Sequence, residues 1–162
     1  MCKAIFLDRD GVLINNQQHY YIWKSDQLEF IDGVFKNLQM LQDNGFQLFI
    51  VSNQGGISRG LYSKEDILKL HDELIQTFRK NKITITEILF CPHHNDTEKC
   101  LCRKPEPLMI EKLIARYDID KAESAMIGDN ESDMIAASGA GISGIKIESN
   151  QNMLPFISKL LQ

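Results

Sequence analysis

The stretch Lys3–Asn15, which reads KAIFLDRDGVLIN, decides the fold. Its apolar run Ala4–Leu7 ends abruptly in the charged turn Asp8-Arg9-Asp10-Gly11. A short apolar run closed by a turn with glycine predicts a buried parallel strand that leads into a loop. In open α/β sheets, functional groups lie at the carboxyl ends of the strands. Asp8 at the strand tip and Asp10 one turn later are therefore candidate site residues, although Asp and Gly are also common turn residues.

The composition is that of an ordinary globular domain. The chain has 162 residues, of which 43% are hydrophobic and 25% are charged, so we expect one domain over residues 1–162. The net charge of −4 does not favour nucleic acid as a partner, and no apolar run reaches membrane-spanning length. Since no apolar signal region precedes the first strand, we expect a cytoplasmic protein. In that reducing compartment, the clustered members of its 4 cysteines would bind metal rather than form disulfides.

Strands and helices alternate along the rest of the chain. Apolar runs predict strands at Gln47–Ser52, Glu87–Cys91, Ser124–Ile127 and Gly144–Ile147. Apolar periodicity and capping residues predict helices at Gly33–Asn44, at Ser63–Lys80, after Pro105 and Pro107, at Met134–Ser138 with Gly139 as its stop, and at Pro155–Leu161. The segment Asn15–Phe30 predicts a surface loop that either carries binding groups or is held by its own aromatics. This alternation is typical of an α/β fold with a doubly wound, Rossmann-like parallel sheet and helices on both faces.

Polar side chains follow three of the predicted strands. Asp8 and Asp10 follow the first strand, Ser52 ends the second, and Asp129 and Asp133 follow the fourth. If these strand ends are neighbours, Asp8 and Asp129 could share Mg²⁺, which prefers oxygen ligands. A carboxylate nucleophile that approaches an anionic phosphate needs such a cation, and Ser52 could bind the phosphoryl oxygens. The sequence therefore predicts a Mg²⁺-dependent phosphoryl-transfer site.

Two basic residues are ambiguous on their own. Lys104, in the sequence Arg103-Lys104-Pro105, could be a solvated surface charge or the lysine that neutralises a phosphoryl group, and only the other site residues favour the second reading. His71 lies on the helix predicted at Ser63–Lys80, and we expect a structural rather than a catalytic role for it.

Three thiols and one imidazole gather in the polar loop Pro92–Arg103 and at its entrance. Coincidental cysteines are the alternative, but two ligands on each arm match a closed Cys₃His zinc site that folds the loop, with ligands Cys91, His93, Cys100 and Cys102. His94 is the rival of His93 as the fourth ligand. We expect Cys2, which is distant in sequence, to take no part.

The motifs in this order resemble those of the haloacid-dehalogenase superfamily of phosphohydrolases. The resemblance covers most of the chain and is carried by Asp8-Arg9-Asp10-Gly11-Val12, by Ser52, by Lys104 and by Gly128-Asp129 through Asp133. The zinc-ligand pairs just before Arg103 resemble two branches of that superfamily, the heptose 1,7-bisphosphate phosphatases and the histidinol-phosphate phosphatases. Both branches lack a large cap domain, and the motif spacing here leaves no room for one.

The resemblance implies a role for each matching residue. Asp8 would be the nucleophile that forms an aspartyl-phosphate, and Asp10 would be the general acid and then the base. Mg²⁺ would be held by Asp8, the main-chain carbonyl of Asp10 and Asp129, with Asp133 orienting the metal ligands. Phosphoryl stabilisation would come from Ser52 and Lys104, and contacts to the rest of the substrate from Asn53, Gln54 and Arg103.

The sequence leaves the substrate open between the two branches. The segments Phe30–Val34 and Asn53–Gly60 look more like the heptose branch, which we favour, whereas the short zinc loop looks more like the histidinol branch. Both readings predict a monomer that acts on a small phosphate ester and binds neither nucleic acid nor membrane. A non-catalytic phospho-ligand-binding protein with the same fold is the alternative of a different class, but it would not need Asp10.

Overall fold

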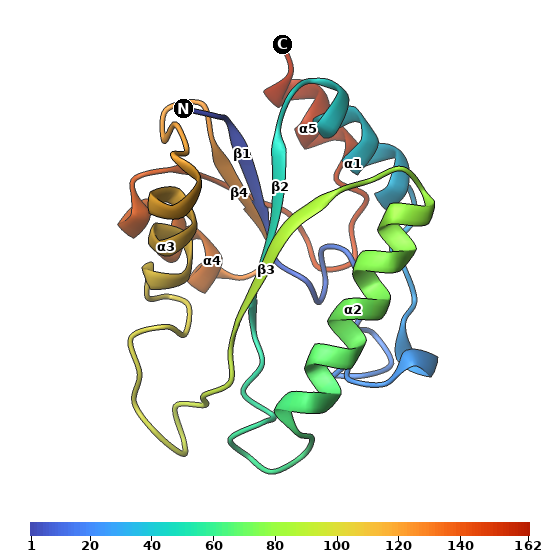
Figure 1. Ribbon diagram of the computed structural model, residues 1–162, viewed down its shortest axis with the longest axis vertical. Coiled ribbons are helices and arrows are strands. Elements are labelled where there is room, and N and C mark those ends of the chain that lie inside the picture. Colours follow the sequence, from blue (N-terminus) through green and yellow to red (C-terminus); the bar gives the residue numbers. More distant parts are fainter.

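The computed structural model describes residues 1–162 and contains one parallel five-stranded sheet (Figure 1). The strand order is β3-β2-β1-β4-β5, which places the first strand at the centre. Every neighbouring pair of strands runs parallel. The strands are β1 (Ala4–Leu7), β2 (Gln47–Asn53), β3 (Ile85–Cys91), β4 (Ala125–Gly128) and β5 (Ser143–Lys146). The predicted doubly wound sheet is confirmed.

Helices cover both faces of the sheet (Figure 1). One face packs against α1 (Val34–Asp43), α2 (Lys64–Lys80) and α5 (Leu154–Leu160), and the other against α3 (Leu108–Tyr117) and α4 (Glu131–Ala140). None of these helices is long and apolar enough to cross a membrane. The connection from β1 to α1 holds only the short 3₁₀ helix η1 (Ser25–Gln27), so no large cap domain interrupts the fold.

The side chains of β1 point alternately to the two faces of the sheet and so contribute to two layers of the apolar core. Ile5 and Leu7 belong to the layer with α1, α2 and α5, whereas Ala4 and Phe6 belong to the layer with α3 and α4. Successive side chains of a strand point to opposite faces, so a strand buried on both sides is continuously apolar. All four residues of β1 are fully buried. The central strand therefore fixes where Asp8, the next residue, leaves the sheet.

The helix after β4 corrects one of the predicted boundaries. The prediction of Met134–Ser138 with Gly139 as the stop is wrong, because α4 spans Glu131–Ala140. It starts three residues earlier because Asn130 and Asp133 form a capping box, and it ends where Gly141 takes a φ of 80°. Gly139 lies inside the helix and faces Pro107. By contrast, α2 starts at the predicted capping box of Ser63 and Asp66.

Candidate active site

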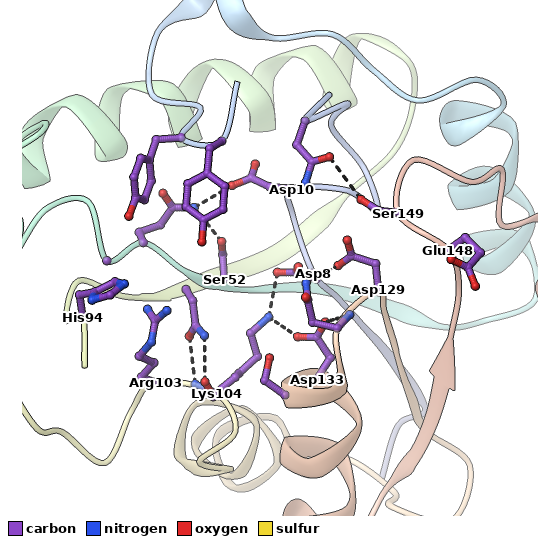
Figure 2. A pocket seen from close by; sticks show the side chains of 18 residues that line it. Asp8, Asp10, Ser52, His94, Arg103, Lys104, Asp129, Asp133, Glu148 and Ser149 are labelled. Atoms are coloured by element: carbon purple, nitrogen blue, oxygen red, sulfur yellow. Dashed lines mark hydrogen bonds and ion pairs between the residues drawn. The ribbon is translucent and has the colours of Figure 1, made fainter. Parts of the chain in front are cut away.

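The polar strand ends meet around one cavity at the carboxyl edge of the sheet (Figure 2). The cavity has a volume of about 450 Å³ and is lined by 18 residues, of which only 2 are hydrophobic. All of the residues predicted to handle phosphate or catalytic Mg²⁺ line it, namely Asp8, Asp10, Ser52, Lys104, Asp129 and Asp133. They come from the carboxyl ends of β1 and β2 and from the segments that follow β3 and β4, and the strand order β3-β2-β1-β4 makes these four strands neighbours.

A buried lysine joins two of the carboxylates. The Lys104 ammonium donates to Asp8 Oδ1 at 2.8 Å and to the Val51 carbonyl at 2.7 Å, and it lies 2.6 Å from Asp133 Oδ1. Figure 2 shows the three side chains pointing toward one another. Lys104 is only 3% exposed, so it is not a solvated surface charge. Burial works against the ammonium, but the carboxylates of Asp8 and Asp133 outweigh that effect and raise the pKa of Lys104.

Around Lys104 the carboxylates outnumber the cationic side chains. Ligand oxygens of Asp8, Asp129 and Asp133 lie within 4.8 Å of one another, whereas Lys104 supplies a single positive charge. Burial raises the pKa of Asp8 to about 7, although Lys104 opposes the shift, and burial also raises the pKa of Asp129. A divalent cation would offset the surplus negative charge, and oxygen-only ligands suit Mg²⁺. The donor set thus fits the predicted metal.

Gly11 makes room for Asp129. It has a φ of 87°, a conformation that residues with a side chain rarely adopt, and a Cβ there would collide with the Asp129 carboxylate. Asp129 itself directly precedes the capping box of α4, and Asn130 donates to its Oδ1 at 2.8 Å. The turn after β1 and the start of α4 therefore pack closely enough for Asp8 and Asp129 to share one ion.

Asp10 is held by hydrogen bonds from two directions. Arg9 donates to both of its carboxylate oxygens at 2.8 Å, and Gln54 Nε2 donates to Oδ2 at 3.2 Å. The same Nε2 donates to Ser52 Oγ at 2.8 Å, and Tyr62 fixes the amide by donating to Gln54 Oε1 at 2.8 Å. Gln54 thereby links the predicted acid/base residue to the predicted phosphoryl-binding hydroxyl.

The three residues predicted to contact the rest of the substrate all line the cavity. The Asn53 amide exchanges two hydrogen bonds with the main chain of Lys104, at 2.9 and 3.0 Å. Gln54 is only 2% exposed. Arg103 is half-buried and donates to the His93 carbonyl at 3.0 Å. Their substrate contacts remain predictions, and of the three Arg103 is the one whose charge faces the cavity next to His94 (Figure 2).

The predicted zinc ligands form one cluster. The ligand atoms of Cys91, His93, Cys100 and Cys102 all lie within 4.8 Å of one another. His93 Nδ1 is 3.4 Å from Cys91 Sγ and 3.2 Å from Cys102 Sγ, whereas His94 lines the active-site cavity. Three thiols and one imidazole at this spacing fit a tetrahedral zinc ion. Cys2 lies apart from the cluster and donates to the Tyr117 carbonyl.

The loop before α1 both packs on the protein and reaches the cavity. Tyr21 and Trp23 lie against Tyr62, each with ring centroids 5.8 Å apart, so aromatic contacts hold the loop. Tyr20 and Tyr21 also line the cavity mouth. The expected loop held by aromatics is confirmed, whereas a binding role for the tyrosines that line the cavity stays a prediction.

Sequence reasoning did not single out Arg9 or Tyr62 as site-supporting residues, and it did not pair Arg9 with His71. Arg9 is wholly buried, and its NH1 lies 3.1 Å from His71 Nε2. Burial and the nearby Arg9 charge lower the pKa of His71 to about 3, so the imidazole is neutral. A partial signal was present: an arginine in the turn that follows a buried strand needs a polar partner, and His71 is the polar residue on the inner face of α2.

The fold and the site define the class of the protein. Aspartates at the end of the central parallel strand, a buried lysine and a hydroxyl at the next strand end are the arrangement of a phosphohydrolase. Residues 101–154 match the model of the HAD-hydrolase-like family.

Relatives and solved structures agree with this class. The chain is 41% identical to D-glycero-β-D-manno-heptose-1,7-bisphosphate 7-phosphatase of Pasteurella multocida, over 88% of this chain and 79% of the relative. It is 43% identical to the D-glycero-α-D-manno-heptose-1,7-bisphosphate 7-phosphatase of Campylobacter jejuni, over 86% and 78%. The crystal structure of D,D-heptose 1,7-bisphosphate phosphatase from B. bronchiseptica, complexed with magnesium and phosphate, superposes with a TM-score of 0.79 at 30% identity, over 88% and 78%. The chain belongs to the haloacid-dehalogenase-like family of phosphatases.

Proposed function

We propose that this chain is a Mg²⁺-dependent phosphomonoesterase that removes the 7-phosphate of a D-glycero-D-manno-heptose 1,7-bisphosphate. The observation that carries the proposal is the buried contact of Asp8 with Lys104, set beside Asp129 and Asp133 at the floor of a polar cavity. It supplies a nucleophile, a cation for the phosphoryl oxygens and ligands for a metal in one place.

The reaction would proceed in two half-reactions. An Asp8 oxygen forms a bond to phosphorus while the bond from phosphorus to the sugar oxygen breaks, and Asp10 gives its proton to that leaving oxygen. Water then attacks the aspartyl-phosphate, its proton passes to Asp10, and Asp8 is released with inorganic phosphate. Ser52 and Lys104 would bind the phosphoryl oxygens in both steps.

We propose separate roles for the two metals. Mg²⁺ would be held by Asp8, the main-chain carbonyl of Asp10 and Asp129, with Asp133 orienting this set, and it would screen the charge between nucleophile and phosphate. Zinc would be structural, because four protein ligands leave no open position on it. It would order the loop that carries His94 and Arg103 to the cavity.

The choice of substrate rests on the relatives and on the cavity. The relatives reported above are heptose bisphosphate phosphatases, which disfavours histidinol phosphate. A cavity lined mainly by polar groups suits a sugar with many hydroxyls, and Arg103 is placed to meet a further anionic or polar group. Because one relative is named for the β anomer and the other for the α anomer, both anomers are candidates.

We further propose that residues 1–162 form one domain that works as a cytoplasmic monomer on small phosphate esters. The shared central sheet, which contributes to both core layers, supports the single domain.

Phosphate release from both heptose bisphosphate anomers and from histidinol phosphate tests the proposal, with Mg²⁺ and with EDTA. We expect the highest kcat/KM for a heptose bisphosphate and no release in EDTA. Asp8→Asn should abolish turnover and leave the melting temperature near that of the wild type. Binding of phosphate esters without turnover under all conditions would instead indicate the non-catalytic alternative, and a preference for histidinol phosphate would refute the substrate.

A further inference from the structure

Arg9 lies between Asp8 and Asp10 in the sequence, and its side chain connects three parts of the fold. Its Nε and NH2 groups donate to the two oxygens of Asp10, each at 2.8 Å, and NH2 also donates to the Ile22 carbonyl at 2.6 Å. The remaining terminal nitrogen, NH1, lies 3.1 Å from His71 Nε2 on α2. A guanidinium presents its donors in a rigid plane, so the paired hydrogen bonds fix the plane of the Asp10 carboxylate.

His71 acts in this contact as an acceptor. An arginine side chain stays protonated and has no acceptor atom, so NH1 donates and Nε2 of a neutral imidazole accepts. His71 is only 4% exposed, and its ring packs edge-on against Phe90 with centroids 5.4 Å apart. The imidazole is therefore held by packing and in turn limits the rotation of the Arg9 guanidinium.

The Asp10 carboxylate is consequently restrained on two sides. Arg9 holds both oxygens, and Gln54 holds Oδ2 while bonding to Ser52. Figure 2 shows the carboxylate beside Ser52 at the wall of the cavity. A carboxylate that has to exchange a proton first with a leaving oxygen and then with water needs this fixed position, because a misplacement of about 1 Å can cost a factor of about 100 in rate.

We propose that Arg9 and His71 are positioning residues for Asp10, with Arg9 aligning the carboxylate and His71 of α2 aligning Arg9. The inference rests on the proposed function, since it assigns the support of the same acid/base residue. It gives α2 a part in catalysis that does not involve contact with the substrate.

The test separates the formation of the phosphoenzyme from its decay, with p-nitrophenyl phosphate as the probe and rapid acid quenching as the readout. The p-nitrophenolate leaving group needs no proton, so formation does not depend on Asp10, whereas decay needs Asp10 to take a proton from water. His71→Leu removes the acceptor and His71→Gln keeps one. Phe78→Leu is the matched control, because Phe78 lies two turns further along the same buried face of α2 and packs its ring against Phe30 and Phe35.

We expect His71→Leu to form the phosphoenzyme at the wild-type rate and to lose it about 10- to 100-fold more slowly, with His71→Gln and Phe78→Leu close to wild type. Arg9→Lys keeps the charge but not the paired geometry and should also slow decay, which covers the case in which His71→Leu does not fold. Unchanged decay in Arg9→Lys, or equal slowing in Phe78→Leu, would overturn the proposal. If the wild type forms no phosphoenzyme, the proposed function fails instead.

Discussion

The burial of His71 predicts a specific dependence of stability on pH. Burial and the Arg9 charge lower the pKa of His71 from 6.5 to about 3 in the folded protein. The unfolded chain therefore binds a proton at this side chain between these two pH values, whereas the folded protein does not. The contribution of His71 to the free energy of unfolding is therefore fully present above pH 6.5, and it is lost progressively as the pH falls below that value. At pH 5 the loss relative to pH 7.5 amounts to about 2 kcal/mol of the free energy of unfolding, from about 1.4 kcal/mol per pH unit.

His71→Gln isolates this contribution. Glutamine keeps an acceptor for Arg9 but does not titrate, so its free energy of unfolding should fall by about 2 kcal/mol less than that of the wild type between pH 7.5 and pH 5. Urea denaturation at both pH values, with fixed concentrations of Mg²⁺ and Zn²⁺, measures the difference. His19→Gln is the control, because His19 is exposed, and it should follow the wild type. An equal pH dependence in His71→Gln and the wild type would refute a buried, neutral His71.

Three further perturbations test other parts of the account. Cys100→Ser should release about one zinc ion per chain and lower the melting temperature, whereas Cys2→Ser should change neither. Metal analysis and thermal unfolding measure both effects, and an unchanged zinc content in Cys100→Ser would contradict the assigned cluster. Lys104→Met leaves two buried carboxylates without their cation, so it should lower the free energy of unfolding by about 3–5 kcal/mol in urea denaturation at pH 7 and remove nearly all activity. A stability equal to that of the wild type would contradict the buried ion pairs. Gly11→Ala should weaken Mg²⁺ activation, seen as a higher Mg²⁺ concentration for half-maximal rate, because its Cβ collides with Asp129; an unchanged Mg²⁺ dependence would show that this close approach is not needed.

The sequence predicted the sheet and the catalytic edge because both depend on local patterns. The apolar run Ala4–Leu7 could only be buried on both faces, and the polar residues at the strand ends follow from the same pattern. Once the parallel order was expected, Asp8, Ser52 and Asp129 had to meet at one edge. The Cys/His cluster could be predicted from the sequence as well, because its residues lie on the two arms of one short loop.

Contacts between segments that are distant in the sequence could not be predicted in the same way. The sequence gives no sign that the Asn53 amide bonds to the main chain of Lys104, 51 residues away. It indicates only that Arg9 needs a polar partner, and the packing of α2 determines that this partner is His71, 62 residues away. The end of α4 was misplaced because glycine can both stop a helix and pack inside one, and the contact of Gly139 with Pro107 depends on how α3 docks. Local patterns thus indicated which side chains gather at the cavity and in the Cys/His cluster, while tertiary packing determined which residues hold them.

The central claim is that Asp8 is the nucleophile, and trapping the phosphoenzyme tests it most directly. In Asp10→Asn the second half-reaction loses its base, so the phosphoenzyme should accumulate with p-nitrophenyl phosphate. Acid quenching followed by peptide mapping should then find phosphate on the peptide that contains Asp8, and none after Asp8→Asn is added to the variant. Continued turnover of Asp8→Asn, or phosphate attached to a different residue, would contradict the account.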